Sequence, residues 1–129
     1  MNKMSISTGK APKAIGPYSQ AVRLGDVLYT SGQLPMHPDS GDIVGSSAAE
    51  QAEQCLANLK AVLQAGSSSM DRVVKTLIFL TDINDFARAN EIYKGYFTSD
   101  YPARTTVQVA KLPTGIHVEV EMIAACRDQ

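Results

Sequence analysis

Apolar residues recur at intervals of three and four in two segments of the chain, the pattern of helices that bury one face. The first segment opens with Ser47 and Glu50, which have the spacing of a capping box, and it ends before Gly66. A helix over residues 48–65 is therefore predicted. It is the clearest local signal in the sequence.

The second helical segment has its apolar positions between Phe86 and Phe97. Asn84 precedes this run and is a residue type that can cap the first turn of a helix. The segment is expected to end at Tyr101-Pro102, because the residue before a proline is disfavoured in helical conformation. A second, shorter helix is predicted here.

Three earlier segments have the character of strands. Residues 18–24 and 27–31 are separated by Gly25-Asp26, and a two-residue turn of this type predicts a β-hairpin. Residues 73–80 form a β-branched, largely apolar run, as expected for a strand that lies centrally in the sheet and is covered on both faces. After the hairpin, residues 35–41 are dense in turn formers, and residues 42–44 are expected to form a short strand.

Two more strands are predicted near the end of the chain, at residues 105–110 and 117–125. The turn formers of residues 112–115 separate them, so a second hairpin is expected. In the last strand, apolar residues alternate with polar ones, and Glu119 and Glu121 share a face with Ile123. Two acids beside an isoleucine are unusual for a plain solvent-exposed face.

The order hairpin, helix, strand, helix, hairpin predicts an α/β (α+β) fold, with a mixed β-sheet and two helices packed on one face. No internal repeat, low-complexity tract or linker interrupts the sequence, so residues 1–129 are expected to form a single domain. The other face of the sheet must then be polar or covered by another subunit.

Composition narrows the possible partners. Hydrophobic residues make up 44% of the chain and charged residues 19%, with a net charge of −1, so neither disorder nor nucleic-acid binding is indicated. The first residues lack the apolar region of a signal peptide, and no run approaches the ~20 apolar residues that cross a bilayer. A cytoplasmic protein without membrane contact is expected. Cys55 and Cys126 suggest no disulfide framework.

The common catalytic and cofactor motifs are missing from the sequence. There is no Gly-rich phosphate loop, no H-E-x-x-H, no G-x-S-x-G and no Cys/His cluster with zinc spacing. With only His37 and His117 available, a metal site would need carboxylates from elsewhere. No metal and no organic cofactor are expected.

What remains is a set of polar residues near predicted strand ends. They are Tyr18, Ser31, Arg104, Thr106 and Glu119. Arg104 follows Pro102-Ala103 at the entry to a strand, and its guanidinium fork matches a carboxylate bidentately. Spacing alone leaves two interpretations open, a carboxylate-binding residue and an ordinary ion-pair partner. The other residues of the set are equally compatible with plain strand-surface polarity.

Several segments occur in an order that closely resembles the Rid family, the YjgF-like reactive intermediate deaminases. The segments are Ile15–Ala21, Thr30–Pro35, Asp82–Phe86, Pro102–Arg104, Val109–Pro113 and Glu119–Glu121. The resemblance runs from about Gly9 to Ala125. It is specific for the family and less so for the substrate.

The resemblance implies a chorismate-mutase-like fold assembled as a homotrimer, with ligand clefts between subunits. It implies hydrolysis of 2-imino acids and their enamine tautomers, such as 2-iminobutanoate, 2-iminopropanoate and 2-aminoacrylate, to 2-oxo acids and ammonia without a cofactor. Arg104 would then hold the substrate carboxylate, and Glu119 would position or activate the attacking water. Tyr18 and Ser31 would line the cleft, and Gly32 would leave room for close backbone approach.

Thr106 stands where many family members have cysteine, so a role that needs a thiolate is excluded, and Thr106 is expected only to line the pocket. Two other functions stay open from the sequence. The same cleft could bind a 2-oxo acid without catalysis in a regulatory protein, or the chain could share the ribonuclease and translation-inhibition activities reported within the family. The near-neutral charge argues against the latter.

Overall fold

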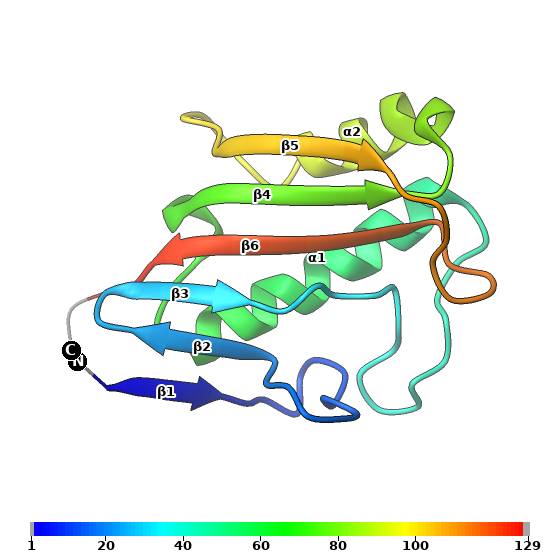
Figure 1. The fold of residues 1–129 in the computed structure, drawn as a ribbon. Coiled ribbons are helices and arrows are strands. Elements are labelled where there is room, and N and C mark those ends of the chain that lie inside the picture. The colour runs from blue at the N-terminus through cyan, green and yellow to red at the C-terminus, as the bar shows by residue number, and fades with distance from the viewer. Residues whose placement is uncertain (1, 128–129) are drawn as a thin grey trace.

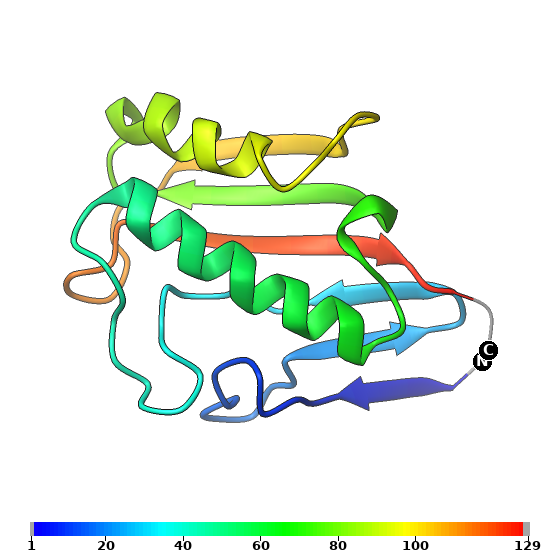
Figure 2. The ribbon, with the colours of Figure 1, turned by 180° about the vertical axis from the view of Figure 1, so that it is seen from behind.

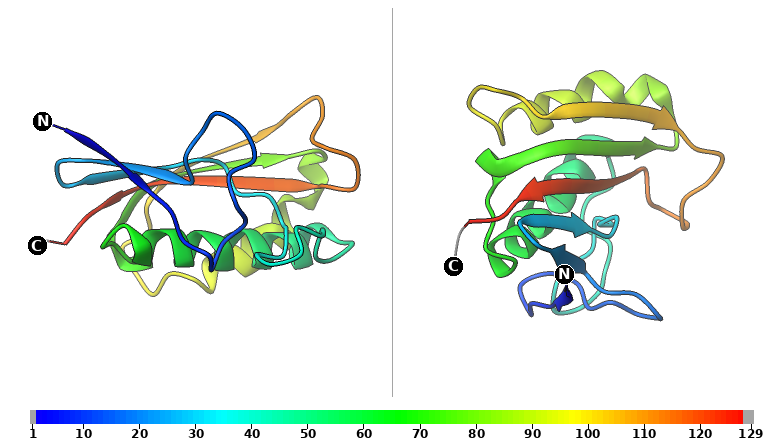
Figure 3. Two further views of the ribbon diagram at one scale, coloured as in Figure 1. Left: turned by 90° about the horizontal axis from the view of Figure 1, so that it is seen from below. Right: turned by 60° about the vertical axis from the view of Figure 1, so that its left-hand side comes forward.

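The computed structural model describes residues 2–127, which form one mixed β-sheet of strand order β1-β2-β3-β6-β4-β5 (Figure 1). The strands are β1 (Lys3–Ile6), β2 (Ala21–Leu24), β3 (Val27–Thr30), β4 (Val73–Leu80), β5 (Ala103–Gln108) and β6 (Val118–Ala125). The α-helices are α1 (Ala48–Ala65) and α2 (Phe86–Lys94). Both lie on the same face of the sheet (Figures 2 and 3), as the order of predicted elements indicated.

Helix α1 has the predicted bounds and the predicted cap. The Ser47 side chain accepts a hydrogen bond from the backbone N–H of Glu50, and the Glu50 carboxylate accepts one in return from the backbone N–H of Ser47. Its buried face also carries two polar residues. Gln51 donates to the carbonyl of Gly115 at 2.8 Å, and Asn58 donates to the carbonyl of Met36 at 2.9 Å. These amides attach the loops at one end of the sheet to the helix.

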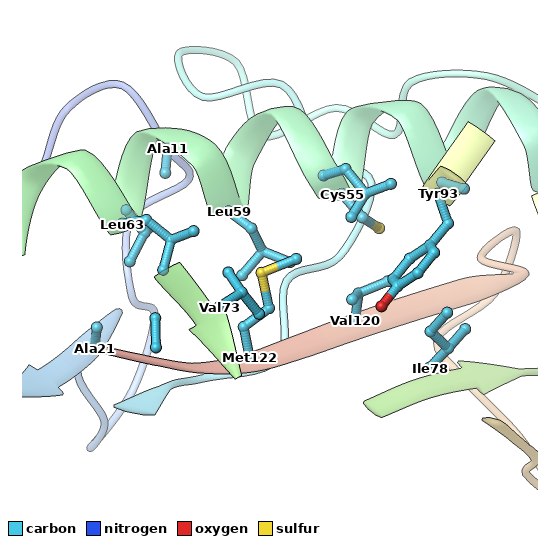
Figure 4. Packing of buried hydrophobic residues seen from close by; sticks show 14 of the residues in the cluster. Ala11, Ala21, Cys55, Leu59, Leu63, Val73, Ile78, Tyr93, Val120 and Met122 are labelled. Carbon is cyan, nitrogen blue, oxygen red and sulfur yellow. The ribbon is translucent and has the colours of Figure 1, made fainter. Parts of the chain in front are cut away.

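The core lies between α1 and the sheet (Figure 4). Leu59 of α1 and Val120 and Met122 of β6 are almost completely buried there. Full burial of one such side chain stabilises the fold by about 1.5–3 kcal/mol. In β6 the buried and half-buried positions alternate along the whole strand, so the predicted alternation of this strand is confirmed.

The predicted second hairpin is wrong. β5 pairs with β4 in parallel, and β6 lies between β3 and β4 with antiparallel pairing on both sides. The reason is the connection through α2, which returns the chain to the start of β4 and so makes β5 a parallel edge strand. β6 instead takes the interior place, where its apolar side chains are covered by α1. The loop at 109–117 is therefore a link between separated strands.

β4 has the predicted bounds and is an interior strand, but the prediction that it is covered on both faces is not met within one chain. Positions such as Thr76 are buried against the helices, whereas Lys75 and Leu77 on the other face remain half-buried. No helix among residues 2–127 lies on that other face (Figure 3). It is called the open face below.

Several boundaries also differ from the prediction. Asp82, rather than Asn84, supplies the cap: its carboxylate accepts from the backbone N–H of Asn84 and begins a short 3-10 turn that precedes α2. Helix α2 ends at Lys94. Residues 42–44 form only an isolated bridge, between Ile43 and Met36, and β1 was not predicted. Neither helix in the described range is long and apolar enough to cross a membrane.

Candidate functional site

Arg104 lies on the edge strand β5 and points to the side of the sheet that the helices cover. Its Cα is paired with that of Thr76, whose side chain is fully buried on the same side. Directly paired residues of neighbouring strands share a face of the sheet. The strand that carries Arg104 follows Pro102, whose ring restricts the backbone at this entry point.

The guanidinium of Arg104 is held in place by three residues of α2. Its Nη1 donates a hydrogen bond of 2.6 Å to the side-chain carbonyl of Asn90. Its Cζ lies 5.1 Å from the centre of the Phe86 ring and 4.9 Å from that of the Tyr93 ring, distances at which a cation is attracted to an aromatic face. Phe86, Asn90 and Tyr93 follow at helical spacing, so one face of α2 supports the guanidinium.

The Tyr93 side chain is held in place by contacts in the core. Its hydroxyl shares a 2.8 Å hydrogen bond with the hydroxyl of Thr76 in the core, where the Tyr93 ring is visible in Figure 4. The ring also packs against Phe97 with a centroid distance of 4.9 Å. The Tyr93 ring therefore provides a rigid surface under the guanidinium of Arg104.

A cavity of about 500 Å³ opens beside Arg104. Its lining residues are Asn90, Tyr93, Lys94, Tyr101, Pro102 and Arg104. Of the five N–H donors of the guanidinium, one is used by Asn90, and the hydrogen bonds found among residues 2–127 occupy no other. The remaining fork can bind a carboxylate bidentately.

Thr106 lies two residues beyond Arg104 on the same face of β5. Its hydroxyl oxygen is buried and has no hydrogen-bond partner among the described residues. A buried hydroxyl without a partner costs free energy, so this position has capacity for one more hydrogen bond. The Arg104-Asn90-Thr106 group is called the arginine half-site below.

Glu119 lies on the open face, on β6, where it is half-buried opposite Phe79 of β4. Burial raises the pKa of the Glu119 carboxyl above its usual value, and the charge of Glu121, two residues further along the same face, raises it further. A carboxyl whose pKa is moved toward neutrality is suited to accept and return a proton.

Gly32 lies directly against Glu119. A Cβ atom built on Gly32 would overlap the Oε2 atom of Glu119 and would lie 2.7 Å from its Cδ. The loop is fixed here because Gln33 and Val120 exchange backbone hydrogen bonds of 2.7 and 3.2 Å. The absence of a side chain at position 32 is therefore what leaves room for the Glu119 carboxylate.

Ser31 and Tyr18 lie beside Gly32 in different roles. The Ser31 hydroxyl donates to the carbonyl of Ser19 at 2.6 Å, so it clamps the segment that carries Tyr18. Tyr18 is 53% exposed, and it lines a second cavity, of about 430 Å³, together with Gly32. Glu119 and Gly32 are called the glutamate half-site below.

The two half-sites are separated within one chain. Arg104 pairs with Thr76 and Glu119 pairs with Phe79, on opposite faces of the sheet and with β4 between them. With about 3.3 Å per residue along a strand and about 4.8 Å between strands, their Cα atoms lie roughly 14 Å apart. One small substrate cannot touch both side chains of the same chain.

Other chemistry-bearing residues lie elsewhere. Among residues 2–127 there is no group of three His, Cys, Asp or Glu side chains placed to hold a metal ion. His37 accepts a backbone hydrogen bond from Asp39 within its own turn. Cys55 and Cys126 are buried free thiols, and burial raises the pKa of Cys55, with a smaller contribution from Glu119. Such a thiol stays protonated and unreactive.

Asn90 is the site residue that sequence reasoning missed. It is the partner of Arg104, yet the sequence suggested only a helical segment with an apolar stripe. The available signal was its position four residues after Phe86 and three before Tyr93, which puts an amide on the face that should be apolar. A polar residue in that place needs a buried partner.

Comparison with known proteins gives one consistent result. Residues 8–126 match the protein family described as Endoribonuclease L-PSP. The human 2-iminobutanoate/2-iminopropanoate deaminase is 52% identical over 119 residues, which cover 92% of this chain and 87% of that protein.

Two solved structures from Escherichia coli are also similar. The TdcF protein with bound serine has a TM-score of 0.90 at 43% identity, and the YjgF gene product has 0.91 at 43% identity. Each comparison covers 96% of this chain and 99% of the other. The resemblance noted in the sequence is thereby confirmed, and the chain belongs to the Rid (YjgF-like, L-PSP) family.

Proposed function

We propose that this protein is a hydrolytic deaminase that converts 2-imino acids and their enamine tautomers, such as 2-iminobutanoate and 2-iminopropanoate, to 2-oxo acids and ammonia. The observation that carries the proposal is the Arg104 guanidinium, held by Asn90 and two rings with its remaining donors beside a cavity. The 52% identity with a human protein named for this activity supports it.

The reaction needs orientation and one proton shuttle. Water adds to the carbon of the C=N bond and gives a tetrahedral intermediate, which then loses ammonia and leaves the 2-oxo acid. Arg104 binds the carboxylate and thereby holds the imine carbon in position for attack by water. Glu119 takes a proton from the attacking water and gives it to the nitrogen, and it then carries the proton of the new hydroxyl to the same nitrogen, so that ammonia leaves as the C=O bond forms. The stoichiometry requires no redox cofactor.

Two copies of the chain are needed if Arg104 binds the substrate and Glu119 transfers its protons. Arg104 and Glu119 point away from opposite faces of one sheet, so an arginine half-site can meet a glutamate half-site only across a contact between subunits. The open face supports such a contact, because Tyr29 and Val107 on it are 46% and 37% exposed. A homotrimer with clefts between neighbouring subunits would bring the two half-sites together and would cover the open face.

The activity is tested by generating 2-iminobutanoate with a threonine dehydratase in the presence of semicarbazide. The protein is expected to lower the yield of semicarbazone, because it hydrolyses the imine before semicarbazide captures it. An unchanged yield would rule out the deaminase. Binding of 2-oxobutanoate without turnover would then identify a metabolite-binding protein.

Arg104→Ala is expected to abolish the activity while the trimer persists in sedimentation. Removal of one partner of a buried charge pair typically costs about 2–5 kcal/mol, which corresponds to a loss of at least ~30-fold in kcat/KM. Arg88→Ala is the matched control, because Arg88 is an exposed arginine on α2. A retained rate in Arg104→Ala would mean that the carboxylate is held elsewhere.

A further inference from the structure

The cavity beside Arg104 has more positive charge than a simple imino acid requires. Among the six residues that line it within one chain are two cations, Arg104 and Lys94, and no acid. The volume of about 500 Å³ also exceeds what a four-carbon imino acid fills. A positive cavity in a chain of net charge −1 favours a ligand with more than one negative charge.

Lys94 is placed to meet a second anionic group. Asn90, which contacts the Arg104 guanidinium, lies four residues before Lys94 on α2, so the two share one face of the helix. Four residues correspond to roughly 6 Å along the helix axis. An extended five-carbon dicarboxylate has its two carboxylates separated by a distance of this order.

Lys94 is not held by another strong interaction. Its ammonium lies 4.0 Å from the Glu91 carboxylate, with side chains 59% and 72% exposed. An exposed pair at this distance contributes little, so the ammonium can turn toward a ligand. Tyr101, which also lines the cavity, is exposed as well.

We propose that this cavity selects 2-imino and 2-oxo acids with a second carboxylate at the far end of the carbon chain, with Arg104 binding the 1-carboxylate and Lys94 the distal one. The proposal rests on the deaminase function for its substrate class, the imines of acidic amino acids. Lys94 is a specificity residue in this scheme and takes no part in the proton transfers.

The test measures binding of two stable 2-oxo acids, 2-oxoglutarate and 2-oxopentanoate, by titration calorimetry with the assembled protein. Both have five carbons, and they differ by a distal carboxylate in place of a methyl group. The wild type is expected to bind 2-oxoglutarate about tenfold more tightly. In Lys94→Gln the ratio of the two affinities should fall to about one.

Lys60→Gln is the control, because it removes an equal charge from an exposed position on α1 outside this cavity. It should leave the wild-type ratio unchanged. Equal affinities of the wild type for the two acids would overturn the proposal, as would an equal effect of Lys60→Gln and Lys94→Gln. These results do not depend on turnover, so a failure of the deaminase assay with 2-iminobutanoate remains a separate result.

Discussion

Gly32→Ala tests whether the Glu119 carboxylate needs its present position. The added methyl would overlap the Oε2 atom of Glu119 and would lie 2.7 Å from Cδ and 3.1 Å from Cγ. Carbon atoms in contact prefer about 3.5–4.0 Å. The backbone at Gly32 has no positive φ, so alanine itself is accommodated without backbone strain.

The carboxylate must therefore move by about 1 Å, since the end of its flexible side chain yields more easily than the backbone bridge between Gln33 and Val120. A displacement of 1 Å can cost about 100-fold in rate when a reacting group is positioned. The free energy of unfolding should change little, because two effects offset each other. The steric overlap destabilises the folded state, whereas alanine restricts the unfolded chain and so stabilises the protein by about 0.4–1 kcal/mol. Gly32→Ala is thus expected to be a folded protein with about 1% of the activity.

The measurement is the semicarbazide competition assay combined with thermal unfolding. Gly9→Ala serves as the control, because a Cβ at Gly9 meets nothing within 4 Å and its φ is not positive. It should keep the wild-type rate. If Gly32→Ala is folded and keeps the full rate, the position of the Glu119 carboxylate does not matter, and the assignment of Glu119 as the proton-transfer group is wrong.

Two further predictions concern the carboxyl pair and the buried hydroxyl pair. Burial and the charge of Glu121 both raise the pKa of Glu119, and the active base is the deprotonated form, so the rate falls as the pH drops through this pKa. Glu121→Gln should therefore move the acid limb of the kcat/KM profile to lower pH, and a limb that stays or moves upward contradicts the coupling. Tyr93→Phe leaves the Thr76 hydroxyl buried without a partner and should cost about 1–3 kcal/mol in urea unfolding, whereas Tyr93→Phe combined with Thr76→Val should recover most of this loss. A single variant as stable as the wild type would mean that the hydroxyl pair does not stabilise the fold.

The elements with a clear local sequence pattern were predictable from the sequence. The bounds of α1 and β4 follow from a capping box, a terminal glycine and an unbroken β-branched run, all of which act within a few residues. The alternation in β6 also correctly placed Glu119 and Glu121 on one face and the apolar residues on the other. Local spacing decides which side of its own element a residue occupies.

The order of the strands was not predictable in the same way. A turn between two strands suggested that 105–110 and 117–125 pair with each other, but β5 pairs with β4 and β6 lies on the other side of β4. Strand order is decided by which apolar faces can be covered by α1 and α2, and this is a property of the whole packed domain. The role of Asn90 was unpredictable for the same reason, because its partner Arg104 is 14 residues away in sequence and reaches it only through packing.

The sequence by itself determined the family and two main elements and offered the candidate residues of the site, because motifs and hydrophobic periodicity are local. Only the tertiary structure decided that Arg104 and Glu119 lie on opposite faces of one sheet, and that α2 supports the guanidinium. The physical reason is that a residue's side of its own strand is set by alternation, whereas the partner of that strand is set by long-range packing. That long-range result is what separates the proposed carboxylate-binding group from the proposed proton-transfer group and makes a second copy of the chain part of the proposed site.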